Sequence, residues 1–397
     1  MRILVLCPFV PFPPTHGGRI RSGVMLRALA ANWDVHVVTP IDGDAEATAA
    51  DALARELGVT VERLEPGRDS TSPGAKLRMW VRGRSEVIWR RWSRAAIEQA
   101  HRIVVTDPDA IVVVDGTFAA PLLPKRCSSR IVFAPHNVEA EVVARMGASA
   151  RGAAAIPPRV ETRRIAALER SLVRRAAQTI AVSELDRRAF ARLVPGAPIR
   201  VIENTVDVAG VTPLAPKAPG QAPVLLFVGS FGYPPNREAA DELLDRHLPA
   251  LREAWPDAVV RLVGNDRTGE IARRASGVAG AEAVGFVDDL RDEYAACDAV
   301  YIPLRSGGGT RIKVLEAMAF GRPVVATETA VEGLDLERGR HYLSCETPAD
   351  GVASVRELRG GAAGKVAEVG RSFVEERFDH AVAVADWSEM FEEIGRR

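Results

Sequence analysis

The sequence contains few cysteines, and their spacing argues against both a zinc site and a disulfide framework. Among its 397 residues there are four: Cys7, Cys127, Cys297 and Cys345. No two of them stand at the paired spacing of metal ligands, and such isolated cysteines fit a reducing cytoplasm. We therefore predict a cytoplasmic protein that does not depend on a zinc site or on disulfides.

The sequence also lacks an excess of either charge and any long apolar run. Lys and Arg together number 52, as do Asp and Glu, which argues against a dedicated nucleic-acid binder. The apolar run at residues 3–7 ends at Pro8, so it is too short for a signal peptide or a membrane span. No Gly-x-Gly-x-x-Gly follows either leading strand, which disfavours a nicotinamide dehydrogenase.

What the sequence does contain is a long alternation of strand-like and helical patterns. In the first half, strand-like runs cover residues 2–7, 35–39, 59–64, 111–114, 131–134, 179–182 and 200–202. A helical pattern at residues 20–31 separates the first two runs. Strands that alternate with helices indicate a parallel sheet with both faces covered.

A second alternation begins after the proline-rich segment 213–220, which we interpret as a linker. Its strand-like runs cover residues 224–229, 259–264, 283–287, 299–303 and 323–327, with helical patterns at 237–254 and 290–297. Residues 381–394 carry apolar side chains at roughly helical spacing, so a last helix must pack on something.

A chain of this length is expected to form two domains, each with its own core. We predict an α/β protein in which two Rossmann-like domains face each other across a cleft. The predicted parts are a first domain at 1–207, a linker at 208–220, a second domain at 221–378, and a helix at 379–397 that packs back on the first domain.

The most informative motif is Ser-Gly-Gly-Gly-Thr-Arg-Ile-Lys-Val-Leu-Glu-Ala-Met at residues 306–318, which follows the run 299–303. Three glycines between a strand and a helix expose backbone N–H groups, and Arg311 and Lys313 add positive charge there. Glu316 lies on the opening turns, where its carboxylate can accept hydrogen bonds from hydroxyls. The motif predicts a nucleotide-sugar site; the plainer alternative is a turn with surface cations and a capping Glu.

Two positions in the first half are also candidates. Gly17 and Gly18 follow the first strand and let a ligand approach the backbone closely, or else form a tight turn. His136 follows the run 131–134, at the strand edge where open α/β sheets place ligands. It would hydrogen-bond the donor sugar or orient the acceptor hydroxyl, and His16 is a competing candidate.

Seven short segments matter by their order and spacing along the chain, which together argue against a chance agreement with a family pattern. They are residues 14–18, 135–139, 180–184, 201–207, 227–236, 285–288 and 307–325. Together they resemble the retaining glycosyltransferases of family 4, of the glycosyltransferase group 1 type, which have the two-domain GT-B fold. The resemblance extends over nearly the whole chain. It implies transfer of a sugar from a nucleoside diphosphate sugar to an acceptor hydroxyl with retention, the donor bound by the second domain and the acceptor by the first.

The motifs and the resemblance together predict the site residues. The catalytic group comprises Glu316, His136, Arg311 and Lys313, and the acceptor contacts come from His16 and Asn137. The predicted donor-binding residues are Gly17, Gly18, Ser230, Phe286, Val287, Gly307, Gly308, Gly309, Thr310 and Leu315.

The sequence departs from the family pattern in two places. The family commonly has a pair of Glu residues with seven residues between them; Glu316 matches the second, but Gly308 stands at the first. An Arg and a Lys that hold the diphosphate in the family correspond here to Ser230 and Pro235. We expect Arg311 and Lys313 to replace them. The Gly-Gly-Gly-Thr-Arg-x-Lys-x-Leu-Glu form resembles a branch associated with bacterial surface polysaccharides.

We expect no metal and no cofactor, the donor substrate being a UDP-sugar or a GDP-sugar. Mg²⁺ would need carboxylates near the phosphates, and no Asp-x-Asp stands beside the glycines. The adjacent Asp288 and Asp289 are better explained by a helix N-cap.

Two stretches make the first half basic. Residues 76–94, from Lys76 to Arg94, interleave cations with tryptophans. They would contact an anionic membrane surface or a lipid-linked acceptor, or else form a solvated helical face with the tryptophans in the core. Residues 159–175 contain six arginines together with Glu161 and Glu169, which is typical of a solvated helix.

The sequence thus predicts a cytoplasmic glycosyltransferase, peripheral at the inner face of the membrane, with a carbohydrate or lipid-linked acceptor and no nucleic-acid partner. Two alternatives stay open. One is a nucleotide-sugar 2-epimerase on the same fold. The other is a non-catalytic nucleotide-sugar-binding protein, motivated by Gly308 at the place of the first Glu.

Overall fold

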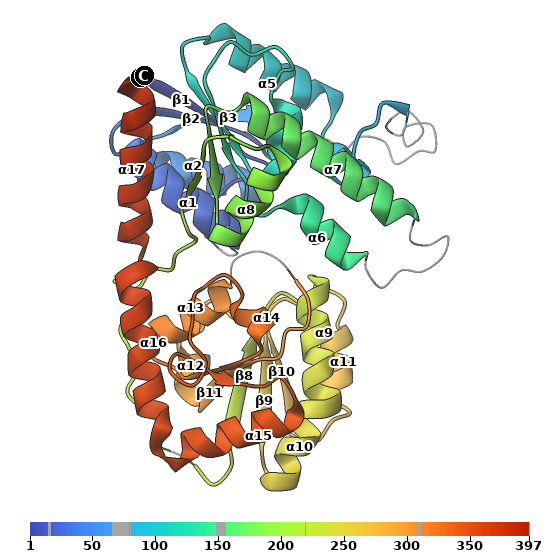
Figure 1. The fold of residues 1–397 in the computed structure, drawn as a ribbon, viewed down its shortest axis with the longest axis vertical. Helices are drawn as coiled ribbons and strands as arrows, with labels where there is room; N and C mark the ends of the chain where they lie inside the picture. The colour runs from blue at the N-terminus through green and yellow to red at the C-terminus, as the bar shows by residue number, and fades with distance from the viewer. Residues whose placement is uncertain are drawn as a thin grey trace. The chain divides into compact units, whose positions relative to one another are not determined.

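The computed structural model describes residues 1–14, 17–65, 79, 81–147, 156–218, 220–307 and 311–396, and these form two compact units (Figure 1). Unit 1 comprises Met1–Asn204 together with the C-terminal Ala381–Arg397. Unit 2 comprises Thr205–Gly307 and Arg311–His380.

Unit 1 is built on a seven-stranded sheet in the order β3-β2-β1-β4-β5-β6-β7, with every pair parallel. The strands are β1 (Arg2–Leu6), β2 (Asp34–Pro40), β3 (Thr60–Leu64), β4 (Ile111–Asp115), β5 (Ile131–Ala134), β6 (Gln178–Ala181) and β7 (Ile199–Val201). All residues of β4 and β5 are buried, as expected for strands covered on both faces. The predicted strands of this half are confirmed to within two residues at each end.

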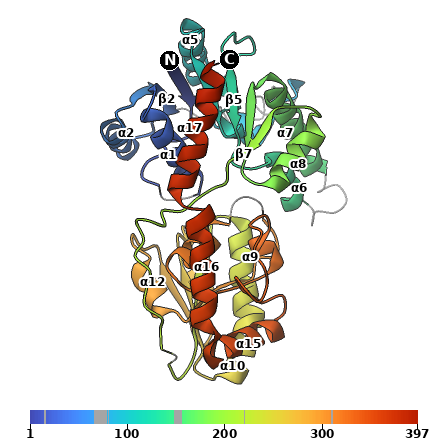
Figure 2. The same ribbon diagram turned by 60° about the vertical axis from the view of Figure 1, so that its left-hand side comes forward.

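Helices cover both faces of this sheet. They are α1 (Gly17–Ala30), α2 (Asp44–Leu57), α4 (Glu86–Trp89), α5 (Arg94–Thr106), η1 (Thr117–Leu122), α6 (Glu139–Met146), α7 (Ile156–Arg175), α8 (Glu184–Leu193) and α17 (His380–Arg396). Because side chains alternate along a strand, Ile3 and Val5 of β1 pack with α1 and α17, whereas Leu4 and Leu6 pack with α5 and α7. Figure 2 shows α17 lying beside α1.

Unit 2 has a six-stranded parallel sheet in the order β10-β9-β8-β11-β12-β13. The strands are β8 (Val224–Val228), β9 (Val259–Val263), β10 (Ala281–Gly285), β11 (Ala299–Ile302), β12 (Val324–Ala326) and β13 (Leu343–Ser344). The predicted strand at 283–287 begins and ends two residues later than β10, whose ladder with β9 shifts register between Ala283 and Gly285. The two-residue β13 was not predicted, since so short a strand has no periodic pattern.

The helices of unit 2 are α9 (Pro234–Glu242), η3 (Leu243–His247), α10 (Leu248–Ala254), α11 (Glu270–Ala275), α12 (Arg291–Ala296), α13 (Ile312–Ala319), α14 (Glu328–Val331), α15 (Pro348–Glu357), η4 (Leu358–Ala362) and α16 (Ala363–Arg377). The predicted helix at 237–254 is formed by α9, the π-helical η3 and α10 in succession. In both units the chain order of the strands reverses between the first and the fourth strand, as in doubly wound Rossmann-like sheets. The predicted α/β fold is confirmed.

The segment expected to be a linker belongs to unit 2. Val208 lies in the core of that unit, and the Arg371 guanidinium donates hydrogen bonds to the carbonyls of Val208 and Val211, each at 3.1 Å. Arg322 donates to the carbonyl of Ala215 at 2.9 Å. Proline content indicated a segment with little to bury, but its backbone partners come from residues more than a hundred positions away.

Candidate active site

In unit 2 the candidate donor site lies at the carboxyl ends of β8 and β11. In doubly wound sheets a crevice opens where the strand order reverses, and these two neighbouring strands mark that point. The chain leaves β8 through Gly229 and Ser230, and it leaves β11 toward Gly307 and α13. A Cβ atom on Gly229 would lie 2.9 Å from the side chain of Asn236, so only glycine leaves room for that side chain.

Lys313 lies on the first turn of α13 and is held in place by two contacts. Its Nζ donates a hydrogen bond to Asn236 Oδ1 at 2.6 Å and lies 4.4 Å from the centroid of the Phe227 ring. Asn236 Nδ2 in turn donates to the carbonyl of Ser230 at 2.9 Å. Burial, reinforced by the nearby Arg311 cation, lowers the pKa of Lys313 to about 7. Its hydrogen-bond partner Asn236 is neutral, so an anionic ligand would stabilise the charged form of Lys313.

Arg311 stands immediately before α13 and is buried. Its Nη2 donates to the carbonyl of Gly307 at 3.4 Å and forms an ion pair with Glu332 Oε2 at 3.3 Å. Gly307 has φ of 121°, a conformation that only glycine adopts readily. This hydrogen bond joins Gly307, the first glycine of the turn, to Arg311 at the start of α13.

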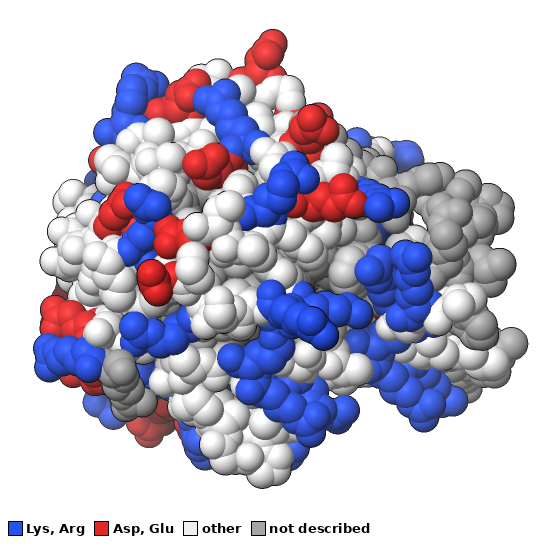
Figure 3. All heavy atoms as spheres, turned by 90° about the horizontal axis from the view of Figure 1, so that it is seen from above, with Lys and Arg blue, Asp and Glu red and all other residues white. Residues whose placement is uncertain are grey.

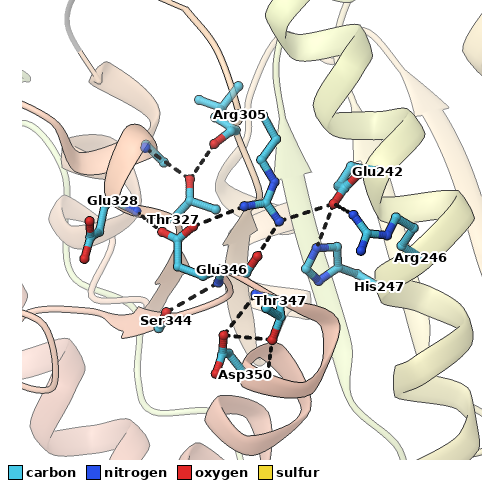
Figure 4. A network of polar contacts seen from close by, with 12 residues as sticks. Glu242, Arg246, His247, Arg305, Thr327, Glu328, Ser344, Glu346, Thr347 and Asp350 are labelled. Carbon is cyan, nitrogen blue, oxygen red and sulfur yellow. Dashed lines mark hydrogen bonds and ion pairs between the residues drawn. The ribbon is translucent and has the colours of Figure 1, made fainter.

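The loop from β11 to this turn is anchored by Arg305. Its guanidinium donates to Glu346 Oε2 at 3.1 Å and to Glu242 Oε1 at 3.2 Å, which joins the ends of β11 and β13 to α9 (Figure 4). Ser306 adds a hydrogen bond from its Oγ to Glu238 Oε2 at 2.7 Å. These contacts tie the two residues before Gly307 to α9 and to the residue that follows β13 by two positions.

Glu316, one turn further along α13 than Lys313, is half-buried and accepts a hydrogen bond from the Tyr294 hydroxyl at 3.0 Å. Tyr294 is fully buried on α12 and stacks on Phe320, with ring centroids 4.5 Å apart. Burial raises the pKa of Glu316, while the Tyr294 hydroxyl and the Lys313 cation act in the opposite direction. One carboxylate oxygen thus has a fixed donor, and its orientation is set by a side chain from another helix.

The other predicted donor residues are spread more widely. Ser230 is exposed beside Asn236, whereas Leu315 is fully buried in the core, so only its backbone is placed to contact a ligand. Phe286 and Val287 follow β10, which β9 and β8 separate from β11. Phe286 is 62% exposed, and Val287 packs against the core.

In unit 1 the corresponding strand ends hold a His–Asp pair. His136 Nε2 lies 2.8 Å from Oδ1 of Asp115, the last residue of β4. The carboxylate is 1% exposed, and its Oδ2 accepts hydrogen bonds from Ser22 Oγ at 2.6 Å and from Cys7 Sγ at 3.4 Å. Because an ionised carboxylate can only accept, His136 donates through Nε2, which leaves Nδ1 as its acceptor atom when the ring is neutral.

Two glycines make room for this imidazole. A Cβ on Gly18 would lie 3.2 Å from His136 Nδ1, and one on Gly116, where φ is 78°, would lie 3.5 Å from the ring. Gly17 and Gly18 form the start of α1, the helix that follows β1. The absence of a side chain at Gly18 thus has a cause inside unit 1, the close approach of His136.

The segment after His136 is held by buried carboxylates. Asn137 Nδ2 donates to Glu139 Oε1 at 3.1 Å. Glu169 of α7 is fully buried and accepts the backbone N–H groups of Glu139 and Ala140 at 2.8 and 3.3 Å, which caps α6. Burial raises the pKa of Glu169 to about 8. This cap fixes the backbone that carries His136 and Asn137.

His16, Gly308, Gly309 and Thr310 lie outside the described residues, as do residues 76–78 and 80 of the basic region. Within the described residues, no three His, Cys, Asp or Glu side chains are grouped to hold a metal ion. No helix in the same ranges has the length and apolar character needed to span a bilayer.

Sequence comparisons match both halves of the chain to glycosyltransferase families. Residues 23–209 match the family described as Glycosyltransferase Family 4, and residues 222–358 match the one described as Glycosyl transferases group 1. The chain belongs to the glycosyltransferases. No curated protein matches its sequence.

Solved structures show the same fold at low sequence identity. Sucrose-phosphate synthase from Thermosynechococcus elongatus has a TM-score of 0.73 at 17% identity, over 100% of this chain and 99% of that one. HepE from Anabaena, solved with UDP and glucose, has a TM-score of 0.67 at 17% identity, over 99% of each chain. TarM from S. aureus has a TM-score of 0.69 at 11% identity, over 98% and 99% respectively. The fold of this glycosyltransferase is therefore GT-B.

Sequence reasoning about this glycosyltransferase missed three polar residues that the structure places against its candidate residues. They are Asp115 beside His136, Tyr294 beside Glu316 and Asn236 beside Lys313. Asp115 left one signal, an acidic residue closing the apolar strand Ile-Val-Val-Val-Asp. Tyr294 left none, because its partner lies 22 positions away, and Asn236 stood only as the last residue of the segment 227–236, 77 positions from its partner.

Proposed function

We propose that this glycosyltransferase moves a hexose-type sugar from a UDP-sugar or GDP-sugar to an acceptor hydroxyl with retention of anomeric configuration, without a metal. The observation that carries the proposal is the cationic start of α13 at the strand-order reversal of unit 2. There Lys313 has a neutral partner, Arg311 adjoins a glycine with positive φ, and Glu316 stands one turn further along. A diphosphate would pair with Lys313, whose hydrogen-bond partner is neutral, and would add an anionic partner for Arg311 beside Glu332.

In this reaction the bond between the anomeric carbon and the diphosphate oxygen breaks as the acceptor oxygen bonds to that carbon. The acceptor proton leaves with the diphosphate oxygen. Arg311 and Lys313 stabilise the negative charge that grows on the departing diphosphate. The Tyr294 hydroxyl donates a hydrogen bond to Oε2 of Glu316. We assign Oε1 of the same carboxylate to hydrogen bonds from ribose or sugar hydroxyls.

His136 serves the sugar side of the reaction. Asp115 fixes its ring, so that Nδ1 either accepts a hydrogen bond from the donor sugar or orients the acceptor hydroxyl. Asn137, the residue after His136, is half-buried, and we assign it to the acceptor. Both residues belong to unit 1, to which we assign acceptor binding.

Relatives of the same fold support this substrate class. HepE was solved with UDP-glucose, and TarM with UDP and alpha-GlcNAc-glycerol. WaaG, with a TM-score of 0.65, is described as a glycosyltransferase involved in lipopolysaccharide biosynthesis. We accordingly propose a role in bacterial surface polysaccharide or glycoconjugate synthesis, on a carbohydrate or lipid-linked acceptor.

We also propose that the protein works in the cytoplasm and attaches peripherally to the membrane, with residues 76–94 as one basic contact. In the described part of this region the tryptophans face inward. Trp92 is buried and donates from Nε1 to the carbonyl of Phe118 at 2.9 Å, and Trp89 is half-buried under the Arg84 guanidinium, 3.8 Å from its ring. Of the described cations of this region, Arg82 and Arg90 are exposed and are assigned to the anionic surface, whereas Arg94 pairs with Glu98.

The proposal is tested by calorimetry with UDP and GDP and by transfer assays over a panel of acceptors. Arg311→Ala with Lys313→Ala is expected to weaken nucleotide binding by at least about 30-fold, and Glu316→Gln to lower turnover by about 100-fold with the fold intact. Glu253→Gln, an exposed carboxylate in unit 2, is the matched control. Unchanged nucleotide affinity in the double variant overturns the phosphate assignment.

The two alternative functions give different results in the same experiments. NMR of the donor incubated alone shows an epimerised sugar if the protein is a 2-epimerase, and at most slow hydrolysis if it is a transferase. Nucleotide binding with no turnover on any acceptor favours a non-catalytic binding protein.

A further inference from the structure

The outer face of α7 carries a row of arginines. Arg159, Arg163, Arg170 and Arg174 are all exposed. With 3.6 residues per turn they fall within about 60° of one another around the helix and extend about 22 Å along it. We call these four residues the arginine stripe.

The acidic residues of α7 do not neutralise the stripe, because both are used on the inner side of the helix. Glu161 accepts hydrogen bonds from Ser85 Oγ and from the backbone N–H of Val87, the latter at 3.0 Å. Glu169 is fully buried as the cap of α6. Within the described ranges, no stripe arginine forms an ion pair. The sequence predicted a basic, solvated helix that includes two acids, and the structure places both acids on the inner side, so the arginine stripe forms a cationic face.

Further cations adjoin the stripe. Arg175 Nη2 donates to the carbonyl of Pro124 at 2.6 Å, which brings the loop with the exposed Lys125 and Arg126 against the C-terminal end of α7. Figure 3 shows Lys and Arg side chains gathered over one side of this unit with few acidic side chains among them. The basic surface is thus wider than one helix.

Exposed apolar side chains lie at the opposite end of α7. Ile156, on the same side of the helix as the stripe by its spacing, is 58% exposed. Met146, at the end of α6, is 52% exposed, and the Gly147 that follows it packs against Pro158 of α7. Large apolar side chains so exposed, beside cations without counterions, are typical of a surface that adsorbs to a bilayer.

We propose that the arginine stripe of α7 docks this protein on an anionic lipid bilayer, with Ile156 and Met146 entering the headgroup region. Guanidinium groups pair bidentately with lipid phosphates, and a row about 22 Å long contacts several headgroups at once. A soluble polyanion would engage the cations but would give the apolar residues no role. The inference rests on the proposed peripheral attachment and moves its main contact from residues 76–94 to α7.

The test is flotation of the full-length protein with vesicles of phosphatidylcholine alone and with vesicles containing 30% phosphatidylglycerol. The wild type is expected to float only with the anionic vesicles, and less so in 500 mM than in 50 mM NaCl. The variant Arg159→Gln, Arg163→Gln, Arg170→Gln and Arg174→Gln is expected to lose at least about 30-fold in partition coefficient. Ile156→Ser is expected to weaken the binding that remains at high salt.

A control removes the same charge from exposed arginines of unit 2, through Arg267→Gln, Arg273→Gln, Arg338→Gln and Arg356→Gln, and should float like the wild type. Thermal unfolding and UDP binding of each variant report its folding. Equal flotation of the stripe variant and the wild type overturns the proposal, as does stripe-dependent binding to heparin without binding to vesicles. Because transfer to a soluble acceptor is measured separately, failure here leaves the transferase proposal standing, and the reverse also holds.

Discussion

The Tyr294 hydroxyl donates a hydrogen bond to Glu316 Oε2 at 3.0 Å, which links α12 to the carboxylate assigned to substrate hydroxyls. Arg322 in turn donates from Nε to the carbonyl of Tyr294 at 2.6 Å, so the tyrosine is fixed at both its backbone and its side chain. Tyr294 is therefore a positioning residue that acts through Glu316.

Tyr294→Phe should lower kcat by about tenfold, because Oε2 of Glu316 loses the hydrogen bond that the Tyr294 hydroxyl donates. The Tyr294 hydroxyl lowers the pKa of Glu316 against the opposing effect of burial. Its removal raises that pKa further, so the acid limb of the pH–rate profile should move to higher pH. Tyr342→Phe, another buried tyrosine of unit 2, is the control. An unshifted acid limb contradicts the positioning role.

Binding of UDP should be coupled to proton uptake through Lys313. The pKa of this ammonium is about 7 in the free protein, so at pH 8 most of it is neutral, and a diphosphate favours the charged form. We expect uptake of a fraction of a proton at pH 8, less at pH 6, and an affinity that falls as pH rises above 7. Calorimetry in buffers of different ionisation enthalpy measures the uptake. Lys313→Met should abolish the difference; uptake that persists in this variant assigns the proton to another group.

Asp115→Asn should lower kcat/KM by about 100-fold while leaving the Kd for UDP within about twofold of wild type. The carboxylate selects the His136 tautomer, whereas the nucleotide is assigned to unit 2. Asp109→Asn, an exposed carboxylate of unit 1, is the control. An equal loss of UDP affinity would show that the change acts beyond the His136 side chain.

Gly18→Ala should also lower kcat/KM while leaving the Kd for UDP unchanged, but the loss of activity should be smaller than in Asp115→Asn. The new Cβ would lie 3.2 Å from both His136 Nδ1 and Phe9 Cζ, so the imidazole must shift by a few tenths of an ångström. Gly23→Ala, whose Cβ would be 3.8 Å from its nearest neighbour, is the matched control on α1. Comparable activity of the two variants would remove the close approach as the reason for glycine at position 18.

The two units should respond to acid in opposite directions. Burial raises the pKa of Glu169 in unit 1 to about 8, so its unfavourable contribution diminishes as pH falls from 8 toward 4.5. Burial lowers the pKa of His247 in unit 2 to about 4, so stability is lost as pH falls from 6.5 toward 4. Each unit of pKa change corresponds to about 1.4 kcal/mol.

Native-state hydrogen exchange, corrected for intrinsic rates, measures the pH dependence of stability in each unit separately. Between pH 7.5 and 5, protection of β4 should increase and that of β11 should decrease. Glu169→Gln should reduce the response of unit 1 without removing it, since burial also raises the pKa of Asp186 to about 6, and the amide still accepts the N–H groups that cap α6. A parallel response of both units in the wild type contradicts the assignment.

The fold followed from the sequence because buried parallel strands are nearly continuous apolar runs, which can be recognised without knowing their neighbours. Residues 131–134 were predicted to be a strand and are β5. The same local logic identified Gly307, Arg311, Lys313 and Glu316, since a glycine turn between a strand and a helix brings its own backbone donors and adjacent cations into one place. Their assignment to a donor site remains a prediction.

Only the tertiary structure decided which side chains face each other. The Asp115 and Tyr294 contacts join residues from different elements, and no sequence spacing encodes such a distance. The exposed charge of α7 was decided in the same way: along the chain six arginines stand with two acids, and packing turned Glu161 and Glu169 inward and left the arginine stripe outside. Local pattern therefore fixed the strands and the glycine turn, while hydrogen bonds between distant segments determined the partners of the candidate catalytic residues and left the arginine stripe without acidic neighbours on its own helix face.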